Sequence, residues 1–423
     1  MAGKKKTGKK KSGVKATGSG NAITIRMYNV GFGDAFLVRI PVGSGQRKIL
    51  FDCGSIEAAE NVAMKDVVQR IVQDATDADG KPRIDVVVAT HRHKDHVSGF
   101  ESAAWAGVEV QEVWMPWTEH PTDPEARKIR TTQAGLALAL DSSLSTRPAA
   151  AAEAARARSI VANSLMLTND KAMKLLHSGF VGDPSRWFLP EPQGADSKRS
   201  RTFTTPALPG IKVHVLGPSR GEDVIRDMDP PTGKSYLRLQ VAVNGGAGGL
   251  PAPFKPEFGR SQRDNGAALM PAELDEIHKA GSSSDLAVAV ALDKAVNGTS
   301  LMLMLEVSGT FLLFPGDAQW GTWNAAMRDP EWGDLLKRVA FYKIGHHGSH
   351  NATPVDFVED MLPAGIAAMA STLTRDVWPD IPRGPLLKAL AAKHTDVARS
   401  DQPGQVPQRF KLDNGVIEAR IPL

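Results

Sequence analysis

A strand-like segment that runs directly into a cluster of histidines constrains this 423-residue chain more than any other feature. Residues 83–89 (Arg-Ile-Asp-Val-Val-Val-Ala) have the composition of a buried β-strand, and they lead into Thr-His-Arg-His-Lys-Asp-His at 90–96. A turn after a strand can aim the first two histidines at one point and the Asp-His pair at a second point close by. One loop can therefore serve two metal ions. A solvated histidine-rich turn is the simpler alternative, but four potential metal ligands directly after an apolar strand are improbable by chance.

Two later segments also place polar groups behind apolar strands. Residues 311–317 (Phe-Leu-Leu-Phe-Pro-Gly-Asp) end in Asp317, and residues 342–349 (Tyr-Lys-Ile-Gly-His-His-Gly-Ser) contain His346 and His347. If all of these strands end on the same edge of the fold, the cluster at 90–96, Asp317 and the two later histidines converge. The glycine before Asp317 would let the backbone pass close to the site.

The His-x-His-x-Asp-His pattern resembles the motif of the metallo-β-lactamase superfamily. The surrounding segments are more similar to the hydrolase domain of ComEC, the bacterial DNA-uptake channel. The similar segments, besides those above, are Tyr-Asn-Val-Gly-Phe-Gly-Asp-Ala at 28–35, Ile-Leu-Phe-Asp-Cys-Gly at 49–54 and Asn-Gly-Thr-Ser-Leu-Met-Leu-Met-Leu at 297–305. The matching blocks cover about 21–110, 205–220 and 285–423. The resemblance implies an α/β fold, a metallo-β-lactamase-like four-layer αββα sandwich with helical and loop insertions.

The resemblance also assigns a ligand set. It implies that His91 and His93 hold one metal ion, that Asp95 and His96 hold a second, and that Asp317 bridges the two. Zn²⁺ or Mn²⁺ suits these imidazole and carboxylate ligands, and one or two ions are expected.

Adjacent side chains leave a strand end in different directions, so only one of His346 and His347 is expected to bind the second ion. His346 is slightly favoured as this ligand, which leaves His347 to contact substrate or protonate a leaving group, and makes Asp95 and His347 the catalytic candidates. Asp52 corresponds to a position that hydrogen-bonds the ligand loop, and Asp34 is expected to line the same edge. An ordinary turn is the alternative for each of these two aspartates.

The sequence departs from the family pattern at the first metal position. Family members often supply one more histidine from a strand between the first cluster and Asp317, but the strand expected at 211–216 has none at its tip. His214 lies inside that strand and is expected to be packed, and His120 is expected on a surface loop, although either could substitute. The first ion is therefore expected to be under-coordinated, surrounded by water or absent.

The resemblance favours one large domain over several, and an apolar content of 42% is ample for its core. We expect a disordered Lys-rich tail at 1–20 and a hydrolase domain at 21–423, with a helical insertion at 121–205 and a Gly/Pro-rich loop at 219–283.

The net charge of +4 includes seven lysines within residues 1–20, which hold no acidic residue, so the rest of the chain carries −3. The tail could bind a polyanion by counterion release, or it could be a solubilising extension. No apolar run of a signal peptide precedes Ile23, and the longest apolar stretch, 301–314, is interrupted and too short to span a membrane. Cys53 is the single cysteine, which fits a reducing compartment. A cytoplasmic protein without a membrane segment is expected.

These features predict a metal-dependent hydrolase, with phosphodiester hydrolysis of nucleic acid as the favoured activity. Two alternatives stay open: hydrolysis of a small ester, lactone or phosphoester, and a non-catalytic nucleic-acid-binding module that keeps a metal. ComEC-type domains usually have a His-Pro near 378–382, where this chain reads Trp-Pro-Asp-Ile-Pro. Asp380 could replace that substrate contact, which leaves the substrate open. The oligomeric state is not predicted.

Overall fold

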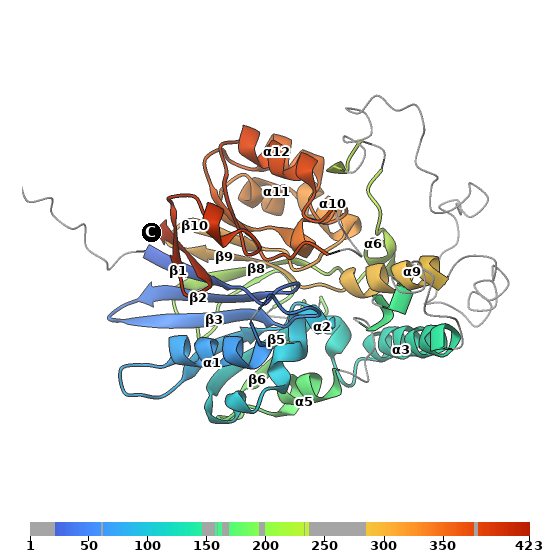
Figure 1. The fold of residues 1–423 in the computed structure, drawn as a ribbon, viewed down its shortest axis with the longest axis horizontal. Helices are drawn as coiled ribbons and strands as arrows, with labels where there is room; N and C mark the ends of the chain where they lie inside the picture. Colours follow the sequence, from blue (N-terminus) through green and yellow to red (C-terminus); the bar gives the residue numbers. More distant parts are fainter. Residues whose placement is uncertain are drawn as a thin grey trace, which may run out of the picture.

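The computed structural model describes residues 22–60, 62–145, 157–158, 160–162, 169–193, 199–231, 233–236, 285–375 and 380–423. Two β-sheets pack face to face, and helices cover the outer face of each sheet (Figure 1). This arrangement confirms the predicted four-layer αββα sandwich.

The first sheet has, in the described part of the chain, eight strands in the order β14-β15-β1-β2-β3-β4-β5-β6. Their bounds are Ala22–Tyr28 (β1), Ala35–Val42 (β2), Gly45–Cys53 (β3), Arg83–Val88 (β4), Glu109–Pro116 (β5), Ser185–Leu189 (β6), Phe410–Asp413 (β14) and Val416–Pro422 (β15). Pairing is antiparallel from β14 to β3 and parallel from β3 to β6.

The second sheet has seven described strands in the order β13-β12-β11-β10-β9-β8-β7. Their bounds are Thr202–Phe203 (β7), Ile211–Gly217 (β8), Met302–Val307 (β9), Thr310–Phe314 (β10), Val339–Lys343 (β11), Ala367–Ala370 (β12) and Asp396–Arg399 (β13). Strands β10 to β13 run parallel to one another.

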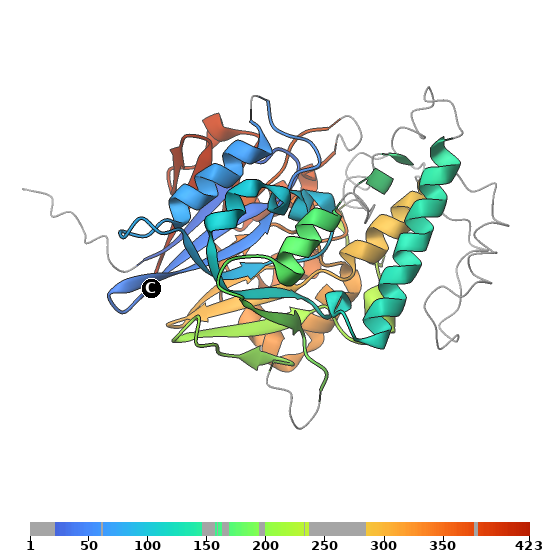
Figure 2. The ribbon, with the colours of Figure 1, turned by 90° about the horizontal axis from the view of Figure 1, so that it is seen from below.

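The helices fall into three groups. Helices α1 (Met64–Ala75), α2 (Lys94–Val97) and α5 (Asp170–Ser178) lie on the first sheet, and α10 (Trp320–Arg328), α11 (Pro330–Leu336) and α12 (Gly384–Ala392) lie on the second. Helices α3 (Pro124–Ser145) and α9 (Asp285–Asn297) lie side by side at one end of the sandwich, near the short α6 (Glu222–Arg226) (Figures 1 and 2). The pair α3–α9 has its own apolar cluster, separate from the cores of the sandwich.

Alternating side chains build the layers. In β3, Ile49 and Phe51 point into the core between the sheets, while Leu50 points into the core under α1. The rings of Phe51 and Phe314 stack across the two sheets with their centroids 4.0 Å apart. Each fully buried side chain of this size contributes roughly 1.5–3 kcal/mol relative to an exposed one. The alternation therefore fixes which side of every strand faces the other sheet.

Some predicted segments differ from the structure. The stretch 121–205 holds helices α3 and α5 in its described residues. It also contains β6, which is an edge strand of the first sheet, and β7, which is an edge strand of the second. The short helix expected near 97–106 is two 3₁₀ turns, η1 (Ser98–Glu101) and η2 (Ala103–Gly107), that follow α2. The tail at 1–20 and residues 237–283 of the expected loop lie outside the described residues.

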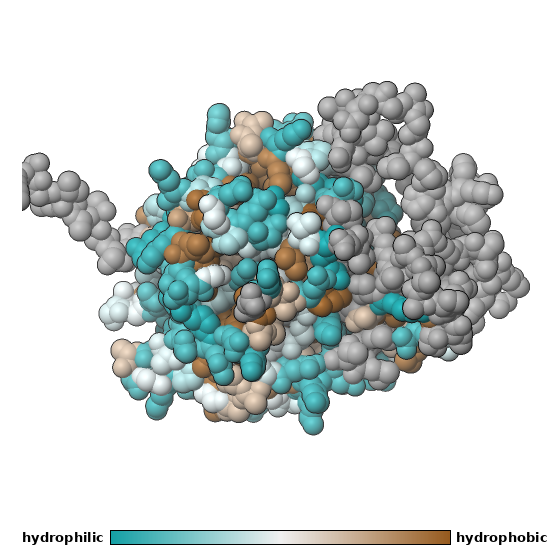
Figure 3. All heavy atoms as spheres, viewed as in Figure 1, coloured by the Kyte–Doolittle hydropathy of each residue, from teal (hydrophilic) through white to brown (hydrophobic). Residues whose placement is uncertain are grey.

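The surface gives little direct indication of a partner. The face in Figure 3 is mostly hydrophilic, with apolar residues in small, scattered groups. Within the described residues, no helix combines the length and the apolar character that a membrane crossing requires.

Candidate metal centre

The predicted ligands meet at the edge where strands of both sheets end. The loop 90–96 follows β4, Asp317 follows β10, and His346 and His347 follow β11. The amide of Leu301 donates to the carbonyl of Thr90 at 2.8 Å, which joins this loop to the second sheet. Convergence of these groups thus follows from the common direction of the strands.

Four side chains form the larger group of possible ligands: Asp95, His96, Asp317 and His347. Each is at most 2% exposed. The Nε2 atom of His96 lies 3.1 Å from Oδ2 of Asp317, and Nε2 of His347 lies 3.2 Å from Oδ2 of Asp95. Two atoms bound to one tetrahedral zinc ion at about 2.0–2.1 Å are roughly 3.4 Å apart, so both pairs are close to the spacing that zinc requires.

A second group comprises His91, His93 and Asp95. The Nε2 atom of His91 lies 3.1 Å from Nδ1 of His93. Burial lowers the pKa of His93 to about 4 and that of His91 well below its usual value, so both rings are neutral, as metal ligation requires. The two groups have Asp95 in common, and the bridging role of Asp317 stays a prediction. Oδ1 of Asp317 accepts the amide hydrogen of His346 at 3.2 Å.

The outer nitrogens of three histidines are held by hydrogen bonds. His96 donates from Nδ1 to Asp52 at 2.9 Å, and His347 donates from Nδ1 to the carbonyl of Ser371 at 2.8 Å. Thr90 gives its hydroxyl hydrogen to Asp52 at 2.7 Å and accepts from Nδ1 of His91 at 3.2 Å. Each ring therefore keeps Nε2 for the interior of the site.

This hydrogen bonding leaves lone pairs facing one another. A neutral His347 that donates from Nδ1 has a lone pair on Nε2, and that lone pair points at a carboxylate oxygen of Asp95. Two acceptors at this distance repel unless a proton or a metal ion lies between them. Burial acts to lower the pKa of His347, but the hydrogen bond to Asp95 and the charge of Asp34 outweigh burial and raise it. The site therefore attracts a cation at this point, and the donor set fits zinc or manganese.

The relation between His346 and His347 differs from the prediction, which slightly favoured His346 as the ligand. His347 belongs to the four-residue group, whereas Nε2 of His346 lies 3.8 Å from Asp317 and 3.4 Å from Nδ2 of Asn297. Both histidines have left-handed backbone conformations, with φ of 46° and 53°, which turn the two rings into different directions. His346 is left at the rim of the site.

Asp34 and Asp52 lie on the outer side of His96, with carboxylate oxygens 3.7 Å and 2.9 Å from its Nδ1. They form a third group with His96. Asp34 pairs with Lys343, whose Nζ also lies 3.7 Å from Oδ1 of Asp317. Burial disfavours the charge on Lys343, but Asp34 and Asp317 outweigh it and hold the pKa of this lysine above its usual value. Lys343 therefore offsets part of the negative charge beneath the ligands.

The two histidines considered as substitutes for the missing ligand, His214 and His120, lie outside the groups of possible ligands. His214 in β8 lies 2.9 Å from the hydroxyl of Thr202 and 3.0 Å from Glu306, so it is a packed strand residue. His120 follows β5, accepts the amide hydrogen of Asp123 through Nδ1 at 3.1 Å, and is absent from the three groups of possible ligands. Asp380 is exposed and pairs with Arg383 at 3.0 Å.

Sequence reasoning missed several side chains that shape the site. Thr90 and Ser371 set histidine orientations, and the charged Lys343 at the end of an apolar strand was a signal that could have been used. Helix α9 contributes Asn297, which is fully buried and donates to Asp293 at 3.1 Å. Nothing in the sequence indicates that this helix reaches the metal residues.

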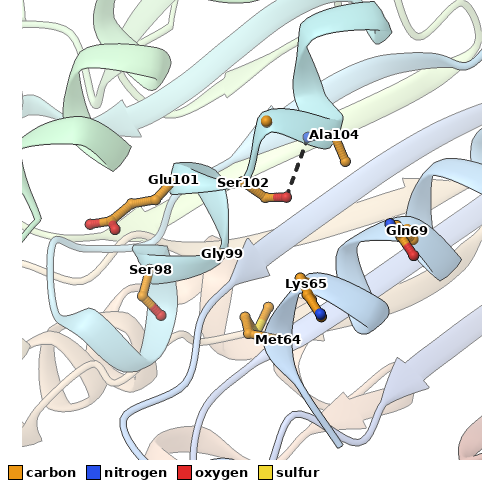
Figure 4. A pocket seen from close by; sticks show the side chains of 9 residues that line it. Met64, Lys65, Gln69, Ser98, Gly99, Glu101, Ser102 and Ala104 are labelled. Atoms are coloured by element: carbon orange, nitrogen blue, oxygen red, sulfur yellow. Dashed lines mark hydrogen bonds between the residues drawn. The ribbon is translucent and has the colours of Figure 1, made fainter.

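A shallow hollow near α1 does not extend the site. It is lined by residues of α1 and of the turns η1 and η2, and it includes none of the grouped ligands (Figure 4). Its two serines are engaged internally: Ser98 accepts the amide hydrogen of Ser55 at 2.9 Å, and Ser102 accepts that of Ala104 at 3.3 Å. We assign it no role in the chemistry.

Comparisons with known proteins add little. No protein-family model matches the sequence, and no curated protein matches it. Among solved structures, the chain is similar to Zn²⁺-bound PqqB from Methylobacterium extorquens, with 10% identity and a TM-score of 0.36 over 87% of this chain and 85% of that chain. At this TM-score the likeness carries no assignment of site or activity.

Replacing Asp52 with asparagine is expected to lower zinc affinity about 10- to 100-fold, as loss of a partner behind a ligand typically does. Asp52 accepts from the amide and hydroxyl of Thr90 and from His96, and an amide group would present a donor to one of these donors. Competition with a chromogenic chelator measures the affinity. The control is Asp85→Asn, because Asp85 is a buried acceptor at the opposite end of β4. Equal affinity of the Asp52 variant and wild type would contradict the role.

Proposed function

We propose that this protein is a metal-dependent hydrolase. The observation that carries the proposal is the close pairing of buried imidazole nitrogens and carboxylate oxygens, among them His347 with Asp95 and His96 with Asp317, each near the spacing of two ligands on one ion. A bound divalent ion lowers the pKa of water toward neutrality and stabilises charge that develops on an oxygen of the substrate.

The chain's own residues have distinct tasks in this proposal. Asp95 belongs to both groups and would hold two ions close together, while Asp52 and Ser371 keep the imidazoles in the ligating orientation. His346 stands at the rim, and burial lowers its pKa, so it is neutral at pH 7. A neutral imidazole there can hydrogen-bond a substrate oxygen or pass a proton to a leaving group. His346 thereby takes the role that the sequence suggested for His347.

Phosphodiester hydrolysis of nucleic acid is the favoured activity. It is supported by the resemblance to ComEC-type domains, by the lysines of residues 1–20 and by cations beside the site. His350 follows the ligand histidines closely in the chain. Burial and the charges of Arg383 and Lys294 lower its pKa to about 4, so both cations lie near it. Arg383 pairs with Asp380, and Lys294 pairs with Asp229. A phosphate group of the substrate would compete with these carboxylates for the two cations.

One observation favours a small substrate instead. Asp293 and Asn297 of helix α9 lie beside His93 and His346, so an acidic group borders the site on that side. Burial and the charges of Asp95 and Asp317 raise the pKa of Asp293 to about 8, so this group is largely neutral at pH 7 without metal. Once bound cations ionise it, Asp293 would repel a polyanion more than a small ester, lactone or phosphoester. This is the second candidate function.

The test is incubation of the purified protein with single- and double-stranded DNA and RNA, with a chromogenic phosphodiester and with a lactone, each with zinc or manganese. We expect cleavage of polynucleotides by wild type and none by the double variant His93→Ala, Asp95→Ala. Cleavage that persists in the double variant would contradict the metal site. Turnover of the small substrates alone would select the second candidate, and metal binding without turnover would indicate a non-catalytic module. Deletion of residues 1–20 should weaken nucleic-acid binding and its salt dependence if the tail contributes.

A further inference from the structure

The four histidines of the two ligand groups follow one rule, in which one nitrogen faces the interior of the site and the other faces outward. For three of them the outward partner is Thr90, Asp52 or the carbonyl of Ser371. The fourth is His93, whose Nδ1 faces Nε2 of His91 at 3.1 Å. Its outward atom is therefore Nε2.

The outward nitrogen of His93 faces a carboxylate from helix α9. Its Nε2 lies 3.9 Å from Oδ1 of Asp293, and the side chain of Asp293 is only 17% exposed. A direct hydrogen bond needs about 2.7–3.2 Å, so a movement of about 1 Å by either side chain is enough to form one.

Asp293 is itself held in place. Asn297, one turn further along α9, is fully buried and donates from Nδ2 to Oδ2 of Asp293 at 3.1 Å. This leaves Oδ1 directed toward His93. A carboxylate that accepts from the outer nitrogen of a ligating histidine fixes the ring orientation and makes the ligand more basic.

We propose that Asp293 is a positioning residue for His93, and that through it helix α9 strengthens metal binding at the His91–His93 group. The inference rests on the proposed function, since it presupposes a metal at this position. Asp293 would thus support the His91–His93 group, which is the metal position with the fewest ligands. Helix α9 packs mainly on α3 through Ala289, Leu292 and Val296, so the α3–α9 pair becomes part of the metal centre and more than an appendage of the sandwich.

The test measures zinc content after dialysis and zinc affinity by titration, for wild type and for Asp293→Ala, Asp293→Glu and Asp229→Asn. Affinity at one of two sites should fall about 10- to 100-fold in Asp293→Ala, as for other outer partners of ligands. Asp293→Glu should recover most of the loss, because the longer side chain keeps the charge and can reach across the gap. Asp229→Asn is the control for α9, since Asp229 pairs with Lys294 on that helix at 2.6 Å. It should bind as wild type does.

The absorption spectrum of the cobalt-loaded protein identifies which site is affected. The spectrum of Asp293→Ala should change in the same way as that of His91→Ala, with the melting temperature of the metal-free variant unchanged. Wild-type affinity at both sites in Asp293→Ala would overturn the inference, and so would loss of both ions together. If wild type itself binds no zinc or cobalt, the proposed function fails first and the inference fails with it.

Discussion

Replacing Asp95 with alanine is expected to remove bound metal and to lower any hydrolytic activity by more than about 100-fold. Loss of a residue that only supports a ligand costs about 10- to 100-fold, and Asp95 belongs to both ligand groups. Its Oδ2 faces Nε2 of His347 at 3.2 Å, so the variant would leave that nitrogen without the carboxylate opposite it. The loop should keep its path, because the carbonyl of Asp95 still accepts the amide hydrogen of Asp34 at 2.9 Å.

Elemental analysis of the purified variant and initial rates on the best substrate measure this effect. The matched control is Lys94→Ala, which changes the neighbouring residue of the same loop without touching either ligand group. We expect the control to keep wild-type metal content. An Asp95→Ala protein that retains two ions would show that the two groups do not share this carboxylate.

The sequence was sufficient to predict the convergence of His91, His93, Asp95, His96 and Asp317. A strand fixes where the next residue emerges, and ligands placed directly after β4 and β10 inherit the edge at which those strands end. The position of these ligands directly after strands therefore predicts that their side chains lie close together. The four layers were predicted from the resemblance, while the alternation of strands and helices favoured only a layered α/β sandwich.

The choice between His346 and His347 could not be predicted in this way. It depends on two consecutive left-handed backbone conformations, φ 46° and 53°, and on the carbonyl of Ser371, which lies after a different strand. Histidine adopts such a conformation more often than most residues, but still only in a small minority of cases. Tertiary contacts select it, and a local pattern does not encode them.

Two other features escaped prediction for related reasons. Strand β6 (Ser185–Leu189) is short and lies within an Ala-rich helical region, yet Trp187 stacks on Trp114 of β5 with centroids 5.8 Å apart. Pairing with a neighbouring strand, and not local propensity, makes this segment a strand. Asp293 was missed because it lies on a helix, just before the motif at 297–305, roughly 200 positions after His93.

The ion pair between Arg92 and Glu119 has the largest effect expected on stability. Arg92 lies between the two ligands His91 and His93, is 8% exposed, and donates to Glu119, which is 3% exposed, through both Nε and a terminal nitrogen. Burial acts to raise the pKa of Glu119, but Arg92 outweighs it and holds this pKa well below its usual value. Both partners are therefore charged at neutral pH, and the bidentate geometry satisfies the guanidinium.

Replacing Glu119 with alanine is expected to lower the free energy of unfolding by about 3–5 kcal/mol, since a buried guanidinium loses its partner. The double variant Arg92→Met, Glu119→Leu should recover most of this loss, because removal of both charges leaves none unpaired. Urea unfolding of the metal-free proteins, followed by tryptophan fluorescence, measures both changes. Zinc affinity separates stability from site geometry: Asn169 still donates to the carbonyl of Arg92 at 2.8 Å in the double variant, so the loop should remain anchored and bind zinc. A loss below about 1 kcal/mol in Glu119→Ala would mean that water reaches Arg92 and that the pair contributes no more than a surface ion pair does.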